Sequence, residues 1–147
     1  VDVPLKGEYS LRDFSRSARY FNVPFKFPAK FPMSTVSAAR AYYWLHGQDC
    51  QKARDFARAV FRAYWVDGRD ISDLAVVQEI AAGLGIDVTA LAAGIGTPEI
   101  KERLKVETDT ALAKGMCGAP YFVVDGEPFW GADRLPQIEK WLATGGF

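Results

Sequence analysis

The residues best suited to binding a ligand lie between Gly115 and Leu135, in the stretch GMCGAPYFVVDGEPFWGADRL. Gly118-Ala119-Pro120 precedes an aromatic and β-branched run, which suggests a cis Ala119–Pro120 bond, because an X-Pro bond has only a modest trans preference. A cis bond turns the chain sharply and leaves the N–H and C=O of Ala119 facing outwards. Such groups bind an extended peptide by strand addition. A trans bond remains the alternative, since most X-Pro bonds are trans.

The nucleophilic and metal-ligating residues form no obvious site. His46 is the only histidine and ends a predicted helix, where the dipole favours a partly cationic imidazole. Cys50 falls in the first turn of the next helix, which can lower the pKa of a thiol, although the position also fits a plain helix residue. Cys117 is far from Cys50 in the sequence. With one histidine and two distant cysteines, neither a metal site nor a Ser/His/Asp triad is predicted.

Composition narrows the class of protein. The 147 residues suit one domain with a real core. Eighteen basic residues offset eighteen acidic ones, so no charge signal favours nucleic acid or an anionic membrane. The longest apolar runs are much shorter than the ~20 residues that span a bilayer. No signal peptide is visible, and the lack of a Cys-x-x-Cys pair favours free thiols in a reducing, cytoplasmic compartment. The aromatic content of 14% predicts a large core or a ring-lined pocket.

Hydrophobic periodicity and capping residues predict six helices before Gly115. The first runs from Tyr9 to Asn22 and stops before Pro24. A stiff, proline-rich connector follows to Pro32, and its phenylalanines suit either a packed linker or the wall of a ligand cleft. The other predicted helices are one from Ser34 or Thr35 to His46, one from Asp49 to Trp65, one capped by Ser72 over Asp73–Leu84, a short one capped by Asp87, and one from Thr97-Pro98-Glu99 to Lys114.

Beyond Gly115 the pattern becomes extended. Tyr121–Val124 is aromatic and β-branched, Asp125-Gly126 is a strong hairpin signal, and Glu127–Trp130 forms the return strand. Leu135 to Leu142 then predicts a last helix. The chain is therefore expected to be α+β and mostly helical.

The motif Gly-x-x-Gly-x-Pro-x-Phe-x-Val-Asp-Gly-Glu-x-Phe-Trp-Gly-x-Asp-Arg-Leu resembles the closing part of 2-hydroxychromene-2-carboxylate isomerases. These are similar to kappa-class glutathione transferases and belong to the DsbA-like branch of thioredoxin folds. The opening Pro4–Tyr9 with Asp13, and then Pro24-Phe25 and Phe31-Pro32, resemble the family's first inserted helix and its connector. The resemblance implies a DsbA-like fold with a helical insert domain, residues 1–114, and the C-terminal β-hairpin and helix of a thioredoxin-like domain, residues 115–147.

The resemblance implies a glutathione site made of two segments. Ala119, before the cis Pro120, would bond the cysteinyl unit through its backbone. Ala132, Asp133 and Arg134 would bind the γ-glutamyl end at a helix start, where free N–H groups suit its carboxylate and Asp133 suits its ammonium. Asp133 also fits a helix N-cap, and Arg134 also fits a support for Asp133.

Further site residues follow from the same resemblance. Lys6 resembles a family lysine near the bound tripeptide, and an exposed, solvated lysine is the alternative. Trp130, Tyr43 and Trp65, together with Trp44, are candidates for lining the pocket of an aromatic substrate. Each of these rings also fits a core position.

The family's opening strand-helix-strand unit has no counterpart in these residues. That unit carries an aspartate-phenylalanine-x-serine-proline motif whose serine favours the glutathione thiolate, and this sequence contains no Ser-Pro pair. No catalytic residue is therefore assigned. Three explanations are open: the residues belong to a longer protein, a second chain supplies the unit, or the chain is a truncation. We favour the first.

The leading hypothesis, as the family implies, is a glutathione-dependent cis–trans isomerase of an aromatic-degradation pathway, acting on a small aromatic substrate as a homodimer. Thiolate addition to a conjugated double bond, rotation and elimination would complete the reaction. The alternatives are a kappa-like glutathione transferase or peroxidase, a DsbA-like oxidoreductase, and a non-catalytic interaction module.

Overall fold

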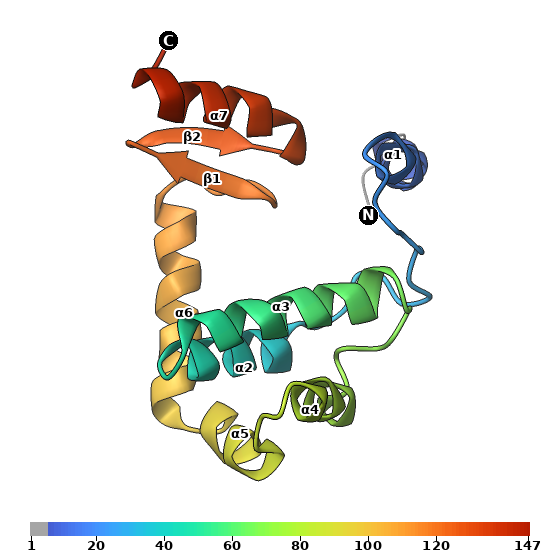
Figure 1. Cartoon of the computed structure of the whole chain (residues 1–147), viewed down its shortest axis with the longest axis vertical. Coiled ribbons are helices and arrows are strands. Elements are labelled where there is room, and N and C mark those ends of the chain that lie inside the picture. The colour runs from blue at the N-terminus through green and yellow to red at the C-terminus, as the bar shows by residue number, and fades with distance from the viewer. Residues whose placement is uncertain (1–5) are drawn as a thin grey trace. The chain divides into compact units, whose positions relative to one another are not determined.

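The computed structural model describes residues 6–147, apart from the side chain of Lys6. Over this range the chain forms seven α-helices, one 3₁₀ turn and two strands, so the expected mostly helical α+β fold is confirmed (Figure 1). The chain divides into two compact units, Val1–Leu104 and Lys105–Phe147, and the division falls within α6 (Pro98–Ala113). The domain boundary between residues 114 and 115 stays a prediction. No helix within residues 6–147 is both long and apolar enough to cross a membrane.

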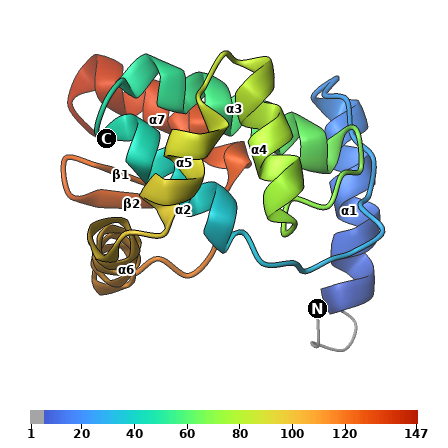
Figure 2. The ribbon, with the colours of Figure 1, turned by 90° about the horizontal axis from the view of Figure 1, so that it is seen from below.

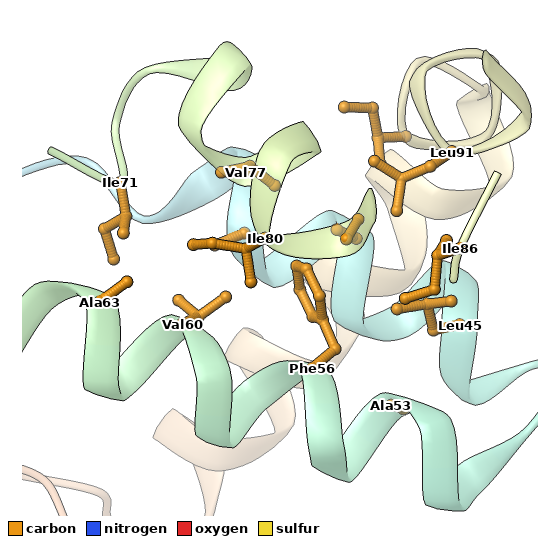
Figure 3. Close-up of a cluster of buried hydrophobic side chains, with 14 of the residues drawn as sticks. Leu45, Ala53, Phe56, Val60, Ala63, Ile71, Val77, Ile80, Ile86 and Leu91 are labelled. Atoms are coloured by element: carbon orange, nitrogen blue, oxygen red, sulfur yellow. The ribbon is translucent and has the colours of Figure 1, made fainter. Parts of the chain in front are cut away.

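Four helices build the core of the first unit: α2 (Val36–His46), α3 (Cys50–Trp65), α4 (Leu74–Gly83) and α5 (Val88–Ile95). Helices α4 and α5 lie on the same side of the α2–α3 pair (Figures 1 and 2). The largest fully buried side chains, Phe56, Val77 and Leu91, come from three different helices. They belong to one cluster of buried apolar side chains (Figure 3). Because burying such a side chain contributes roughly 1.5–3 kcal/mol, this cluster holds the four helices together.

Three of the predicted N-caps are confirmed. The carboxylate of Asp49 accepts from the N–H groups of Gln51 and Lys52 at 2.9 and 3.0 Å. Asp87 caps α5 in the same way. The hydroxyl of Thr97 accepts from the N–H of Ile100, the third residue of α6, at 3.3 Å. Each cap satisfies backbone donors that a helix leaves unpaired at its start.

The predicted end of the first helix was wrong. Helix α1 (Lys6–Tyr20) ends two residues before Asn22. Asn22 adopts a left-handed conformation with φ of 53°. The N–H of Val23 then donates to the carbonyl of Ala18 at 2.9 Å, which closes the helix before Pro24 is reached.

The predicted cap of α4 was also wrong. The carboxylate of Asp73, not the hydroxyl of Ser72, accepts from the N–H of Ala75 at 2.9 Å. The hydroxyl of Ser72 is engaged by Asp70, and it also accepts from the ammonium of Lys30 at 3.0 Å. Hydrogen bonds to the Asp70 carboxylate, first from the Ser72 hydroxyl and then from the ammonium of Lys30, hold the pKa of Asp70 below its usual value.

The proline-rich connector packs against the end of α3. The N–H of Lys26 donates to the carbonyl of Trp65 at 2.6 Å, and the indole of Trp65 stacks on Phe25 with ring centroids 5.7 Å apart. Phe14 of α1 contacts the rings of Phe31 and Trp65 at 6.2 and 6.4 Å. The connector is therefore a packed linker that contacts α1, while Phe31 and Pro32 at its end also line a pocket.

The second unit contains the predicted hairpin of β1 (Tyr121–Val124) and β2 (Glu127–Trp130). Asp125 and Gly126 have φ of 52° and 87°, the two positive values that a type I′ turn needs. Pro128 lies opposite Val123, in a pair that does not exchange hydrogen bonds, so its missing N–H costs the ladder nothing.

Helix α7 (Leu135–Thr144) covers one face of the hairpin (Figure 1). Phe129 and Ile138 are buried between the two elements. The indole of Trp141 meets Phe129 edge to face at 5.8 Å, and its N–H donates to the carboxylate of Asp125 at 3.2 Å. The helix runs two residues beyond the predicted Leu142.

We predict that Gly94→Ala destabilises the protein by about 1–3 kcal/mol. A Cβ at this position would lie 2.1 Å from the indole nitrogen of Trp44, so a ring or a helix must shift. Urea unfolding followed by circular dichroism measures the change. Gly83→Ala is the control, because a Cβ there meets nothing within 4 Å. That control is expected to stabilise by about 0.5–1 kcal/mol, and equal stability of the two variants would contradict the packing described here.

We also predict that the stability lost in Asp49→Ala depends on pH. Hydrogen bonds from the N–H groups of Lys52 and Gln51 lower the pKa of Asp49 in the folded protein. Its contribution is therefore complete above the unfolded carboxyl pKa of about 3.9 and disappears as the pH falls through the lower folded value. Denaturant titrations of wild type and variant between pH 7 and the acid limit test this. Asp49→Asn keeps the acceptor without the charge, and its difference from Asp49→Ala should stay constant with pH.

Candidate functional site

A backbone hydrogen bond joins the two segments predicted to bind a ligand. The N–H of Gly131 donates to the carbonyl of Pro120 at 3.0 Å, one step beyond the Tyr121–Trp130 pair of the ladder. Residues 119–120 and 131–134 thus lie side by side in the second unit. This bond brings together five of the predicted site residues: Ala119, Pro120, Ala132, Asp133 and Arg134.

Ala119 presents its backbone to the surface. The Ala119–Pro120 peptide bond is cis, and Ala119 is exposed. Among the described residues, neither its N–H nor its C=O has a hydrogen-bond partner. An extended peptide has here one donor and one acceptor to pair with.

Ala132, Asp133 and Arg134 form the 3₁₀ turn η1 (Ala132–Arg134), which leads directly into α7. The N–H groups of Ala132 and Asp133 have no partner within residues 6–147, so two donors face solvent at this turn. The carboxylate of Asp133 caps neither η1 nor α7, which corrects the alternative that it is a helix N-cap. It instead pairs with the guanidinium of Arg134 at 3.3 Å, and both side chains are largely exposed, at 65% and 45%.

Two glycines make room for these side chains. Gly131 has φ of 112°, a value that L-residues rarely adopt, and a Cβ there would lie 2.3 Å from a carboxylate oxygen of Asp133. A Cβ on Gly118 would lie 2.5 Å from the indole nitrogen of Trp130. The Asp133 carboxylate and the Trp130 indole therefore each occupy space that only glycine leaves free.

A separate apolar pocket lies in the first unit, with a volume of about 550 Å³. Helices α2 and α3 and the end of the connector form its walls. No charged residue is among the described residues that line it. They are Phe31, Pro32, Met33, Thr35, Ala38, Ala39, Tyr42, Tyr43, Phe56, Ala57, Val60, Phe61, Tyr64, Trp65, Ile71 and Leu104. Such a concave, ring-lined space with few polar groups is typical of small-molecule sites.

The predicted pocket residues are divided between the units. Tyr43 and Trp65 both line the pocket of the first unit. Trp130 belongs to the second unit, where it is 52% exposed beside Gly118. Trp44 packs against Gly94 and is not among the lining residues. Lys6 begins α1, but its side chain lies outside the described residues.

Among the described lining residues that carry a polar group, Tyr64 is the buried one. It donates to the carbonyl of Lys30 at 3.0 Å, which fixes the connector to α3. Burial is the main cause that raises the pKa of Tyr64, and the nearby charge of Asp70 adds to it. Tyr64 therefore stays protonated at neutral pH and serves as a hydrogen-bond donor.

Cys50 and His46 are not among the residues that line the pocket or form the candidate cradle, whereas Cys117 lies two residues before Ala119. The Sγ of Cys50 is 3.7 Å from Nε2 of His46 on the exposed start of α3, and Cys117 is exposed and free. Within residues 6–147, no group of three His, Cys, Asp or Glu side chains is arranged to hold a metal ion.

Sequence reasoning missed most of the pocket lining. Two stripes at helical spacing carry it: the N-cap residue Thr35 with Ala38, Ala39 and Tyr42 of α2, and Ala57, Val60, Phe61 and Tyr64 of α3. The i, i+3, i+4, i+7 spacing was visible in the sequence. It did not show that the two stripes face one space, because a core stripe has the same spacing.

The sequence is similar to that of known proteins over nearly its whole length. Residues 1–143 match the family model of the DSBA-like thioredoxin domain. A 2-hydroxychromene-2-carboxylate isomerase from Sphingobium xenophagum is 32% identical over 141 residues, which cover 96% of this chain and 70% of the relative. Glutathione S-transferase kappa 2 from Caenorhabditis elegans is 29% identical, with 96% and 68% covered.

The fold is shared as well. The solved structure of a 2-hydroxychromene-2-carboxylate isomerase matches with a TM-score of 0.84 at 24% identity, covering 97% of this chain and 68% of that one. The chain thus spans about two thirds of the length of the relatives it matches. From the match over nearly its whole length, the chain belongs to the family of DSBA-like thioredoxin domains.

Proposed function

We propose that the protein binds glutathione in the second unit and uses it to isomerise a double bond of a small aromatic substrate. The observation that carries the proposal is the hydrogen bond from Gly131 to Pro120, 3.0 Å long. It places a free peptide edge beside a turn with free N–H groups. A tripeptide with a charged end needs these two features next to each other.

The peptide edge would hold the middle of the tripeptide. The outward N–H and C=O of Ala119 pair with the cysteinyl unit as in an added strand, and the thiol is thereby fixed relative to the protein. Pro120 has no N–H of its own, so it adds no donor beside Ala119.

The turn would hold the γ-glutamyl end. Its carboxylate accepts from the N–H groups of Ala132 and Asp133, and its ammonium pairs with the carboxylate of Asp133. Arg134, 3.3 Å from Asp133, holds that carboxylate in place. Because Gly131 has no side chain, the carboxylate of Asp133 can occupy this position. The N–H groups of the turn and this carboxylate together fit a zwitterionic ligand.

The aromatic substrate is assigned to the pocket of the first unit. Tyr43, Trp65 and Phe31 offer ring faces and edges for a planar substrate, and the apolar walls exclude water. When bound, glutathione supplies a thiol that adds reversibly to a conjugated double bond. The contribution of the chain itself is to bind glutathione in the second unit and the aromatic ligand in the first.

A kappa-like glutathione transferase is the second candidate, favoured by the 29% identical kappa relative. It would use the same cradle with other electrophiles. The two functions differ in whether glutathione remains in the product, so one pair of assays separates them.

We predict that Asp133→Asn weakens glutathione binding about tenfold, because a charge-assisted pair with the ammonium is lost. Isothermal titration calorimetry measures the dissociation constant. Glu139→Gln is the matched control, since it removes one carboxylate from an exposed position of α7 in the same unit. A glutathione analogue without the α-amino group should bind wild type and Asp133→Asn equally. An equal loss for the analogue would show that Asp133 does not meet the ammonium.

The reaction is tested with 2-hydroxychromene-2-carboxylate as substrate. Isomerisation should require glutathione, should not proceed with S-methylglutathione, and should leave the glutathione concentration unchanged. The same protein is assayed with 1-chloro-2,4-dinitrobenzene, where conjugation consumes glutathione. Conjugation without isomerisation would establish the transferase instead, and turnover of the chromene without any thiol would rule out the proposal.

A further inference from the structure

One wall of the pocket in the first unit is formed by the connector and not by a helix. Phe31, Pro32 and Met33 line the pocket, and they lie in a segment without helix or strand. Among the described residues, no backbone–backbone hydrogen bond involves residues 27–34. The ring of Phe31 contacts Phe27 and Trp65, but apolar contacts are non-directional and do not fix a backbone. The position of this wall therefore depends on hydrogen bonds from side chains.

Ile71, another lining residue, is held more firmly. It lies in the segment between α3 and α4 and is buried in the same apolar cluster as Ala63 of α3 (Figure 3). This cluster holds the helices of the first unit together. Ile71 is therefore a fixed part of the pocket.

Lys30 joins the connector wall to this fixed part. It directly precedes Phe31, and its ammonium lies 3.1 Å from a carboxylate oxygen of Asp70 and donates to the hydroxyl of Ser72 at 3.0 Å. Asp70 and Ser72 are the two neighbours of Ile71 in the sequence. The Lys30–Asp70 pair thus connects two segments that both line the pocket.

The groups around Lys30 are arranged to hold it. One carboxylate oxygen of Asp70 accepts from the N–H of Ser72 at 2.9 Å and from its hydroxyl, and the other oxygen accepts from Lys30. The carbonyl of Lys30 accepts from the hydroxyl of Tyr64 at 3.0 Å. Lys30 is therefore attached both through its side chain and through its backbone.

The Lys30–Asp70 pair is too exposed to support the whole fold. The two side chains are 58% and 46% exposed. Exposed ion pairs contribute little to global stability and are screened by salt. The pair can therefore break while the helices stay folded. A wall that is released in this way loses contacts with a bound ligand, and the ligand then leaves more quickly.

We propose that Lys30 is a positioning residue of the pocket, which holds the connector wall near Ile71 and thereby slows the release of a bound ligand. The proposal rests on the proposed use of the pocket for an aromatic ligand. It requires neither a charge on the ligand nor glutathione, so a neutral ring compound serves as the probe.

The probe is N-phenyl-1-naphthylamine, which is uncharged at neutral pH and fluoresces more strongly in apolar surroundings. Stopped-flow fluorescence gives its dissociation rate constant for the wild type, Lys30→Met, Lys30→Arg, Asp70→Asn and the double variant of Lys30→Met with Asp70→Asn. Lys26→Met is the matched control, because Lys26 is an exposed lysine of the same connector and is not a lining residue.

Dissociation should be about two- to fivefold faster in Lys30→Met, and the double variant should be no faster than this single variant. Lys30→Arg keeps the charge and the donors, so it should release the probe like the wild type, as should Lys26→Met. The ratio of the Lys30→Met rate to the wild-type rate should approach one as salt rises from about 0.01 M to about 1 M, because salt screens the pair in the wild type. A purely structural role would not give this dependence, since the probe is neutral.

Several results would overturn the proposal while leaving the pocket assignment intact. They are an unchanged rate in Lys30→Met, an equal change in Lys26→Met, additive effects of Lys30→Met and Asp70→Asn, no rescue by Lys30→Arg, and a rate ratio that is independent of salt. A wild type that does not bind the probe would overturn the proposal and would also contradict the assignment of an aromatic substrate to this pocket.

Discussion

The candidate glutathione site depends on one backbone hydrogen bond, from Gly131 to the carbonyl of Pro120. Without it the two strands would diverge after the Tyr121–Trp130 pair, and the cradle would be two unrelated loops. At the residue that donates this bond, Gly131, the backbone has a φ of 112°, a conformation that a side chain would hinder. The N–H of this glycine thus joins the two segments of the candidate site.

The helical unit encloses an apolar pocket that its own side chains leave open. Small residues on the pocket side of α2 and α3, such as Ala38, Ala39 and Ala57, leave room, while Tyr43 and Trp65 supply rings at its edge. On another face of α2 the arrangement is reversed, because Trp44 fills the space that Gly94 leaves on α5. The same helix is therefore tightly packed on one side and hollow on another.

Much of the fold was predictable because its signals are local. Asp49, Asp87 and Thr97 cap helices through bonds to the next two or three residues, and Asp125-Gly126 closes a two-residue turn. The predicted cap of α4 failed because other side chains, including the distant Lys30, bind the hydroxyl that was expected to cap it. Ser72 was available as a cap by sequence, but Asp70 and Lys30 engage its hydroxyl, and Asp73 takes its place. The predicted end of α1 was wrong for a local reason, because Asn22 adopts a left-handed conformation.

The candidate cradle residues were identified from the resemblance of the Gly115–Leu135 motif to a known family, and that motif is one continuous stretch of sequence. The sequence by itself determined that a proline corner, a hairpin and a helix start follow one another. Only the tertiary structure decided that Asp133 pairs with Arg134 and does not cap a helix, and that Tyr43 and Trp65 line one pocket while Trp44 does not. The physical reason is that a cap or a turn is fixed by bonds between near neighbours. A pocket, by contrast, is the space left between side chains that only packing brings together.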